Sequence, residues 1–447
     1  MKESNQITRR EMLAQTGKAA AGVGLGLTLG SRMAWAQDGA RVKGANDRLV
    51  IALIGSGGMG RGDMDGFMGH PNVEVAAVCD PDTGHMAEAA AQVEKKQGRR
   101  PREIKDFRKV LEDKDIDAVI VATPDHWHAL PMIYACQAGK DVFCEKPISH
   151  NIREGRMMVN AARHYNRICQ INTWQRSTQH FVDAIDYVRS GKLGTIAVVR
   201  AFKTDNYFMG RQQPKDPPTE LDYDLWVGPA AFVPYQENRC HFNWRWFFDF
   251  AAGMTGDWGV HMIDIALLGM AKDDNLPLPQ SASAVGGKLI HPDDDRTTPE
   301  TQLAVFQFPG WVLHWETHTG DIGLDGGGDH GAEFIGTNGR LMVDRNGWRV
   351  TDKDGKELEK PSSPRRVDDH IGNFLDAVRT RMTPRADVAS LHQTTTVCHL
   401  ANLAYLAGHT IEWDAEREVV TNDAHAMSLL PYRRPYRKPW SLPNVKI

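Results

Sequence analysis

The sequence predicts an α/β protein with two domains, a doubly wound parallel sheet followed by an α+β domain with a mainly antiparallel sheet. Two observations predict the first domain: apolar runs typical of strands buried on both faces recur between residues 49 and 171, and helical patterns separate them. A third observation predicts the second domain, in which Asn-Gly and Asp-Gly turns join strand patterns. At 447 residues the chain is long enough for two cores.

The composition favours a small-molecule partner over a nucleic acid. Hydrophobic residues make up 41% of the chain and charged residues 25%, a composition typical of a soluble globular protein. The formal net charge of -4 creates no general field that would attract nucleic acid or an anionic membrane surface. We therefore expect a small molecule as substrate and no nucleic-acid partner.

The N-terminus shows the three parts of an export signal. Arg9-Arg10 precede an apolar, glycine-rich stretch at residues 19–30, and Ala34-Trp35-Ala36 follows it. We predict a twin-arginine (Tat) signal peptide at residues 1–36 and a linker at residues 37–48; a disordered basic N-terminus is the alternative. The apolar stretch is too short for a spanning helix, which needs about 20 residues. We therefore expect export of the folded protein to the periplasm by the Tat machinery, without stable membrane insertion.

The first predicted domain, at residues 49–172, has apolar runs that end in residues able to bind a ligand. Its predicted strands lie at residues 49–54, 73–78, 118–122, 141–144 and 168–171. In open parallel sheets, ligands bind outside the carboxyl ends of the strands. Site residues are therefore expected directly after these strands.

A glycine fingerprint follows the first strand. Gly55, Gly57 and Gly60 form the pattern G-x-G-x-x-G before a predicted helix, and Asp80 follows the second strand. Such glycines let the backbone approach a pyrophosphate at the helix N-terminus, and the carboxylate would bind the adenosine ribose. Because the Asp80 carboxylate disfavours a 2′-phosphate, we expect NAD rather than NADP. A glycine turn that binds no nucleotide is the alternative.

Lys146 follows the fourth predicted strand, in the run Glu145-Lys146-Pro147. At this edge of the sheet its amine would lie beside a bound nicotinamide and could donate a hydrogen bond to the reacting oxygen. Pro147 restricts the backbone of Lys146 and would hold the strand end in one conformation. A solvated lysine without a catalytic role is the alternative.

Asp257 and His261 stand four residues apart, which predicts that they project from one face of a helix. A neutral histidine can accept a hydroxyl proton while a hydride leaves the same carbon. Asp257 could bind a sugar hydroxyl or orient the imidazole. Taken alone, such a pair on a helix is more often structural, and Lys146 is what favours the catalytic interpretation.

The second predicted domain, at residues 173–385, carries mainly antiparallel patterns. Strand patterns occur at residues 195–200, 303–308, 311–318 and 332–335, with turn dipeptides at residues 338–339, 346–347 and 354–355. An aromatic, proline-containing excursion at residues 205–250 precedes the Asp257 segment. Residues 386–447 are predicted to form C-terminal helices and a tail that returns toward the first domain.

An aromatic cluster before Asp257 has two possible roles. Trp244 and Arg245 could provide a stacking face and a guanidinium for a carbohydrate, but such aromatic residues are as often part of a core. His126 and His128 also admit a zinc site with Asp257 and His261. We expect no metal, because the Cys and His spacings common in structural zinc sites are absent.

Taken together, the motifs resemble the Gfo/Idh/MocA family of oxidoreductases. The resemblance is carried by Gly55 to Gly60, Asp80, Thr123-Pro124 with His126-Trp127-His128, Glu145-Lys146-Pro147 and the Asp257/His261 segment. It implies an N-terminal Rossmann domain and a C-terminal α+β domain with a large open-faced sheet. It also implies that Lys146, Asp257 and His261 are the catalytic residues.

The glycine fingerprint and the resemblance together define the expected ligand contacts. The cofactor contacts are Gly55, Gly57, Gly58, Met59, Gly60, Asp80, Thr123, Pro124, Trp127, His128, Glu145, Lys146 and Asn172. Gln175 and Arg176 join Trp244 and Arg245 as expected substrate contacts. Because most members of this family oxidise or reduce sugars, cyclitols or related polyols with NAD(P), the resemblance implies a carbohydrate substrate.

These observations favour an oxidoreductase that transfers a hydride between a sugar or polyol carbon and a tightly held NAD. Export of a folded protein with its cofactor, into a compartment not expected to supply free NAD, favours tight retention. The alternative is an NAD-dependent glycoside hydrolase or lyase that oxidises the sugar transiently, without net redox change. A noncatalytic NAD-binding or sugar-sensing protein is a third interpretation. An exposed face of the C-terminal sheet would suit a homodimer or homotetramer.

Overall fold

The computed structural model describes residues 48–205, 207–272, 275–319, 328–360 and 369–446. The predicted signal peptide and the linker up to residue 47 lie outside these residues. Within the described part of the chain, none of the helices is both long enough and apolar enough to span a membrane.

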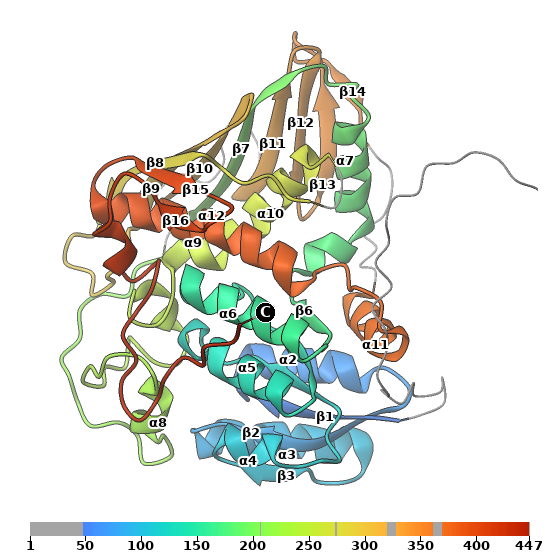
Figure 1. Cartoon of the computed structure of the whole chain (residues 1–447), viewed down its shortest axis with the longest axis vertical. Helices are drawn as coiled ribbons and strands as arrows, with labels where there is room; N and C mark the ends of the chain where they lie inside the picture. The colour runs from blue at the N-terminus through green and yellow to red at the C-terminus, as the bar shows by residue number, and fades with distance from the viewer. Residues whose placement is uncertain (1–47, 206, 273–274, 320–327, 361–368, 447) are drawn as a thin grey trace, which may run out of the picture. The chain divides into compact units, whose positions relative to one another are not determined.

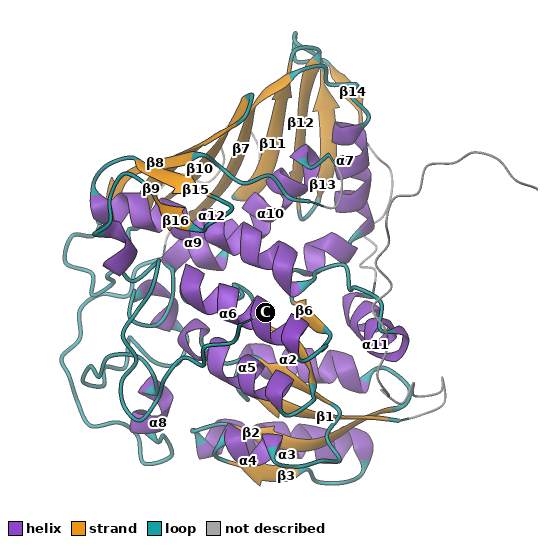
Figure 2. Ribbon diagram, in the orientation of Figure 1, coloured by secondary structure: helices purple, strands orange, loops and turns teal. Residues whose placement is uncertain are grey.

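The first sheet has six parallel strands in the order β3-β2-β1-β4-β5-β6, as Figures 1 and 2 show. The strands are β1 (Leu49–Ile54), β2 (Val73–Cys79), β3 (Arg102–Ile104), β4 (Ala118–Val121), β5 (Asp141–Cys144) and β6 (Cys169–Ile171). This order confirms the predicted Rossmann fold, and its switch point lies between β1 and β4. The sequence did not reveal β3, because this short edge strand is polar and largely exposed.

Helices cover both faces of this sheet, because alternate residues of each strand point to opposite sides. Leu53 packs with α2 and α3, whereas Ile54 packs with α4, α5 and α6. These helices are α2 (Gly58–Met68), α3 (Thr83–Gln97), α4 (Phe107–Leu111), α5 (Ala129–Gln137) and α6 (Ile152–His164). Phe374 and Leu375 of α11 (His370–Thr380) join the same core as Leu53. Thus α11 packs in the first domain, although the predicted second domain extends to residue 385.

The second sheet has ten strands in the order β14-β13-β12-β11-β7-β10-β9-β8-β15-β16. They are β7 (Ile196–Asp205), β8 (Ser281–Gly287), β9 (Thr301–Phe308), β10 (Trp311–Thr319), β11 (His330–Gly336), β12 (Gly339–Asp344), β13 (Gly347–Thr351), β14 (Glu357–Glu359), β15 (Ile411–Asp414) and β16 (Val419–Val420). Neighbouring strands are antiparallel except β7 and β10, and the three predicted hairpin turns join β11 to β14. The predicted mainly antiparallel sheet is therefore confirmed.

Helices cover one face of the ten-stranded sheet (Figure 1). These helices are α7 (Gln179–Arg189), α10 (Gly259–Met270) and α12 (Val388–Ala407). On β9 the side chains alternate between this covered face and an exposed one, and Leu303 and Val305 are 42% and 47% exposed. The exposed face is the open face that the resemblance implied.

The C-terminal tail returns to the first domain. The buried Arg434 donates a hydrogen bond from Nε to Glu154 Oε1 of α6 at 2.7 Å. Trp440 contacts Trp127 edge to face, with ring centroids 4.9 Å apart. In Figure 1 the tail runs beside α5 and α6, as the sequence predicted.

Residues 221–250, which we name the cover segment, lie against the first domain. The segment contains α8 (Tyr223–Val227) and a 3-10 turn (Asn243–Trp246) around its own aromatic core. At its start, the Asp222 amide donates to the Pro81 carbonyl at 3.0 Å, and at its end the His126 amide donates to the Phe250 carbonyl at 3.0 Å. These bonds hold the cover segment near the carboxyl ends of the parallel strands.

Candidate active site

The fingerprint glycines have two different roles. A Cβ on Gly55, whose φ is +95°, would lie 2.5 Å from the Ala122 carbonyl carbon, and a Cβ on Gly60 would lie 2.0 Å from the Gly55 oxygen. These two glycines are needed for the turn itself. By contrast, a Cβ on Gly57 would meet its nearest atom only at 3.9 Å, and one on Gly58 would meet nothing within 4 Å. The space beside Gly57 and Gly58, at the N-terminus of α2, fits a pyrophosphate.

Asp80 lies beside this glycine loop at the end of β2. Its Oδ2 accepts a hydrogen bond from the Ser56 amide at 2.6 Å, and its Oδ1 accepts one from the Asp82 amide at 2.9 Å. Burial raises the pKa of Asp80 to about 6, although the two amides oppose this shift. Its contact with Ser56 places the carboxyl group beside the glycine loop, where the adenosine ribose of a bound dinucleotide is expected.

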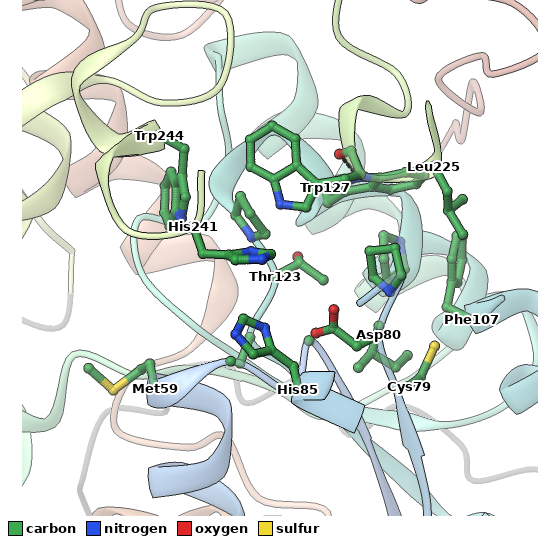
Figure 3. A pocket seen from close by; sticks show the side chains of 18 of the residues that line it. Met59, Cys79, Asp80, His85, Phe107, Thr123, Trp127, Leu225, His241 and Trp244 are labelled. Atoms are coloured by element: carbon green, nitrogen blue, oxygen red, sulfur yellow. Dashed lines mark hydrogen bonds between the residues drawn. The ribbon is translucent and has the colours of Figure 1, made fainter. Parts of the chain in front are cut away.

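A cavity of about 370 Å³ extends from this loop, and both the first domain and the cover segment form its walls (Figure 3). From the predicted cofactor contacts it is lined by Gly55, Gly57, Gly58, Met59, Asp80, Thr123, Pro124 and Trp127. From the cover segment it is lined by Leu225, Trp226, His241, Phe242, Trp244 and Arg245. Trp244 and Arg245 thus belong to the cavity wall, and the volume and donors of the cavity fit a nucleotide.

Lys146 and Asp257 meet across the two domains. Lys146 Nζ lies 2.6 Å from Asp257 Oδ1 and 3.0 Å from the Asp257 carbonyl oxygen. Arg245 Nε lies 3.4 Å from the same carboxylate oxygen, so Arg245 connects this ion pair to the cavity. Burial alone would raise the pKa of Asp257, but Lys146 and Arg245 hold it well below its ordinary value. Asp257 is therefore ionised.

Asp257 and His261 lie on consecutive helices rather than on the single helix that the sequence predicted. Asp257 ends α9 (Gly253–Asp257), Trp258 interrupts the helix, and His261 lies in the first turn of α10. Gly256 and Gly259 flank the interruption, and glycine is a weak helix former. The spacing predicted the proximity of the two side chains but not this break.

His261 is a buried, neutral histidine. It is 4% exposed, and its Nδ1 has no hydrogen-bond partner among the residues that the structure describes. Burial lowers its pKa well below the ordinary value, and the positive charges of Lys146 and Arg345 act in the same direction. The imidazole is therefore unprotonated near neutral pH and can accept a proton.

Glu145 and Asn172 lie behind Lys146 rather than in the cavity wall. Asn172 Nδ2 donates to Glu145 Oε1 at 2.6 Å and to Asp63 Oδ1 at 3.0 Å, and Glu145 Oε2 accepts from the Lys146 amide at 3.1 Å. Burial and the neighbouring Glu145 raise the pKa of Asp63 well above its ordinary value. Asp63 was missed from the sequence, because a single polar residue in a helix gives no sign of such a contact.

His128 contacts backbone carbonyl oxygens with both ring nitrogens, and His126 does so with Nε2, while its Nδ1 has no hydrogen-bond partner among the described residues. The two nitrogens of His128 lie 2.8 Å from the Pro147 and Thr123 oxygens, so this ring links the Lys146 loop to the end of β4. His126 Nε2 lies 3.0 Å from the Trp226 oxygen. These contacts do not direct the two rings toward Asp257 and His261, as the zinc alternative required.

The two substrate contacts predicted after β6 differ in their surroundings. Arg176 donates from Nε and Nη2 to the buried Asp264 at 2.7 and 2.6 Å. The Arg176 guanidinium therefore lies in an interior ion pair and not in the cavity wall, which argues against the expected substrate contact. Gln175 is buried too, and its Oε1 accepts a hydrogen bond from Arg345 Nε at 3.2 Å. Arg345 in turn stacks on Trp258 beside His261. Gln175 is therefore linked to the surroundings of His261 through Arg345.

Two histidines of the cavity wall were not predicted. His241 Nε2 lies 3.0 Å from Asp82 Oδ2, and the His241 and His85 rings have centroids 4.3 Å apart (Figure 3). Among the described residues, Asp82, His85 and His241 form the one group of three whose ligand atoms, all within 4.8 Å, could hold a metal ion. No pattern in the sequence indicates this group, because its members come from segments that meet only in the folded chain.

Comparison with known proteins matches both domains to one family. Residues 49–173 match the oxidoreductase family GFO_IDH_MocA, NAD-binding Rossmann fold, and residues 186–442 match the C-terminal alpha/beta domain of that oxidoreductase family. Levoglucosan dehydrogenase of Pseudarthrobacter phenanthrenivorans is 28% identical over 222 residues, 49% of this chain and 50% of that protein. A glycosyl hydrolase family 109 protein of Shewanella sp. is 27% identical over 154 residues, 34% of each protein. The chain thus spans half or less of the length of these relatives.

The fold also matches solved structures. Aldose-aldose oxidoreductase from Caulobacter crescentus superposes with a TM-score of 0.61 over 82% of this chain and 99% of that chain. At 18% identity, this likeness shows the shared fold. It extends across both sheets, since it covers most of the chain.

Proposed function

The chain belongs to the Gfo/Idh/MocA oxidoreductase family, and we propose that it is an NAD-dependent oxidoreductase acting on a CH–OH group of a carbohydrate. The observation that carries the proposal is the 2.6 Å contact between Lys146 and Asp257, next to the neutral His261. An ammonium group and an unprotonated imidazole together can stabilise the oxygen of a hydroxyl and remove its proton.

Each residue of this group has a distinct role in the proposed reaction. His261 accepts the hydroxyl proton, and Lys146 donates a hydrogen bond to the same oxygen as negative charge develops on it. The ionised Asp257 holds the Lys146 ammonium in position. NAD, when bound, supplies the hydride acceptor. The alcohol carbon then loses a hydride and its oxygen loses a proton, so that the product is a carbonyl compound.

We propose NAD rather than NADP on the position of Asp80. A carboxyl group beside the expected ribose, with Asp82 next in the same loop, disfavours a further phosphate. Replacing Asp80 by serine should remove part of this repulsion. The expected result is that NADP binding improves relative to NAD, by about tenfold.

The proposal includes a periplasmic location and a retained cofactor. Both rest on the twin-arginine pattern at Arg9-Arg10 and on the absence of an expected supply of free NAD after export. A retained cofactor must be reoxidised in place, so the second half-reaction would reduce another carbonyl compound, such as a second sugar. The name of the aldose-aldose oxidoreductase that shares this fold is consistent with such a cycle.

The carbohydrate class is supported by the relatives and by the cavity wall. Levoglucosan dehydrogenase, by its name, acts on a sugar derivative. In this chain Arg245 lies over the Trp244 ring at 4.3 Å and also contacts Asp257, which places a stacking face and a cation beside the ion pair. Sugar rings commonly pack on such aromatic faces while charged groups bind their hydroxyls.

The test uses the full chain purified without added nucleotide. Acid release followed by chromatography identifies any nucleotide that is bound, and the protein is then given aldoses and aryl glycosides. We expect absorbance of reduced nicotinamide to rise with a sugar, without release of the aglycone. Aglycone release without net reduction would assign the redox-neutral glycosidase reaction instead. Failure to bind either NAD or NADP would overturn every nicotinamide mechanism.

A further inference from the structure

The adenosine side of the cavity is closed by the cover segment, which is far from the glycine loop in sequence. Asp222 and Phe250, at the two ends of the segment, are hydrogen-bonded to the first domain. His150 Nε2 also contacts the Phe248 oxygen at 2.7 Å, so the second end is held twice. The part between these anchors carries His241, Phe242 and Trp244 into the cavity wall.

Between its anchors, the cover segment contacts the first domain at two places in the described chain: the Trp226 oxygen lies within hydrogen-bond distance of His126 Nε2 and Trp127 Nε1, and His241 contacts Asp82. Among the residues that the structure describes, the contact of His241 Nε2 with Asp82 Oδ2 is the one side-chain hydrogen bond that joins residues 229–247 to residues 48–172. The two rings of His241 and His85 are in contact beside it. Residues 229–247 thus have this one side-chain hydrogen bond to the first domain, while Asn238 and Arg245 contact Asp295 and Asp257 of the second domain.

The position of the fastening relates it to the cofactor. Asp82 is two residues after Asp80, and its amide donates to Asp80 Oδ1. His85, whose ring contacts His241, lies next to the glycine loop: its Nδ1 would be 3.9 Å from a Cβ on Gly57. The His241–Asp82 contact therefore lies close to both the glycine loop and Asp80, at the expected adenosine half of the site. Figure 3 shows the rings of His241 and His85 close together in the cavity wall.

We propose that His241 and Asp82 form a latch that retains the dinucleotide, so that the cofactor leaves when this hydrogen bond opens and the His241 side chain moves away from Asp82. The proposal rests on the proposed nucleotide binding at this cavity and adds the residues that control its exchange. The parallel strands on the other wall are buried on both faces and cannot open in this way. Opening at His241 breaks one hydrogen bond to the first domain and leaves the buried aromatic core of the cover segment in place.

The side chain of Asp82 serves the latch and the helix with different oxygens. Its Oδ1 accepts from the His85 amide at 3.0 Å and caps α3, while Oδ2 faces His241. A serine at position 82 can still cap the helix with its hydroxyl, but it removes the partner of His241. His241→Phe keeps an aromatic ring in the wall and removes the hydrogen bond from the other side.

His409 provides a matched control. Its Nε2 lies 3.0 Å from Asp423 Oδ2, the same pair of groups at the same distance, on residues that do not line the cavity. His409→Phe therefore removes an equivalent hydrogen bond elsewhere. A general effect of losing a histidine–aspartate contact would appear in this variant too.

The experiment measures the dissociation rate of NADH from the full-length protein, by dilution into excess NAD with nicotinamide fluorescence as the signal. We expect His241→Phe and Asp82→Ser each to release NADH about tenfold faster or more, while His409→Phe stays within about twofold of the unchanged protein. Unchanged release in both latch variants would overturn the latch. If the protein binds NADH but neither latch variant changes the release rate, the latch is wrong and the proposed function stands. If the protein binds no nucleotide, both the latch and the proposed function are wrong.

The same experiment in the presence of EDTA separates a hydrogen bond from a metal bridge. Asp82, His85 and His241 are close enough to bind a divalent cation, which could also fasten the segment. We expect EDTA to leave the release rate unchanged. Faster release in EDTA that added Zn²⁺ reverses would replace the proposed hydrogen bond by a metal site.

Discussion

Two groups next to the cavity are built from the same kinds of residue but differ in burial. In the first group Asp82 of the first domain contacts His241 of the cavity wall, and that histidine side chain is 35% exposed. In the second group Lys146 of the first domain contacts Asp257, beside the buried His261, and Arg245 connects this group to the cavity wall. Burial lowers the pKa of both histidines, but for His261 the charges of Lys146 and Arg345 add to it and the shift is larger.

This difference shows that a histidine beside a carboxylate does not define a function. A partly exposed pair that has a histidine, His85, rather than an ammonium beside it provides a hydrogen bond of modest strength, which suits a contact that must open. A buried group with an ammonium and an unprotonated imidazole provides acid–base chemistry. The comparison can be tested by changing each group separately.

The largest effect is expected at Lys146. Lys146→Met removes the ammonium that steadies the reacting oxygen and should reduce the rate of hydride transfer by roughly 10²- to 10⁴-fold. Nucleotide should remain bound, because Lys146 does not line the cavity wall around the glycine loop. Single-turnover absorbance of reduced nicotinamide measures the chemical step, and fluorescence titration measures binding.

Lys105 is the control for this substitution, because it lines the cavity at the end away from Asp257. Lys105→Met should affect nucleotide affinity more than the single-turnover rate. Equal losses of rate in the two variants would contradict the separation of the cavity into a catalytic end and an adenosine end. A fully active Lys146→Met protein would remove Lys146 from the mechanism.

The glycine loop gives the next largest effect, in two separable forms. Gly60→Ala places a methyl group 2.0 Å from the Gly55 oxygen and should lower the free energy of unfolding by about 1 to 3 kcal/mol. Gly57→Ala meets no such clash and should weaken nucleotide binding about tenfold with the melting temperature nearly unchanged. Thermal unfolding without nucleotide and fluorescence titration distinguish the two; the opposite pattern would reverse the assigned roles.

The pH profile should show a smaller effect that belongs to His261. The active imidazole is unprotonated, and its pKa lies well below the ordinary value of about 6.5, so the rate should persist as the pH falls below that value. Arg345→Gln removes one positive neighbour and should raise the pKa, which moves the acid limb to higher pH. On the acid limb the variant should therefore lose more activity than the unchanged protein at the same pH. A profile that is identical in both proteins would exclude His261 as the titrating base.

The smallest effect on turnover is expected at the open face of the second sheet. Val305 projects from this face, and Val305→Glu should weaken a homodimer or homotetramer formed there while the active site stays intact. Leu406→Glu, at an exposed position of α12, is the matched control. Light scattering after size-exclusion chromatography measures the mass; unchanged mass for Val305→Glu would place any assembly elsewhere.

The sequence predicted the Rossmann strands and about half of the first-domain residues that line the cavity, and local patterns account for the strands and the glycine loop. A buried parallel strand is a short apolar run, and its ligand-binding residues follow within a few positions, as Gly57 and Asp80 do. The hairpins of the second sheet were equally local. The sequence did not predict the edge strand β3 or the packing of α11 against the first domain, because neither has a distinctive local pattern.

By itself, the sequence determined which residues stand at the strand ends and how far apart Asp257 and His261 lie along the chain. Only the tertiary structure decided which of them meet. Lys146 reaches Asp257 over 111 positions, Arg176 pairs with Asp264 in the interior, and His241 pairs with Asp82 at the cavity. The physical reason is that the strength of a charge or a hydrogen bond depends on its partners and its burial, and long-range packing sets both.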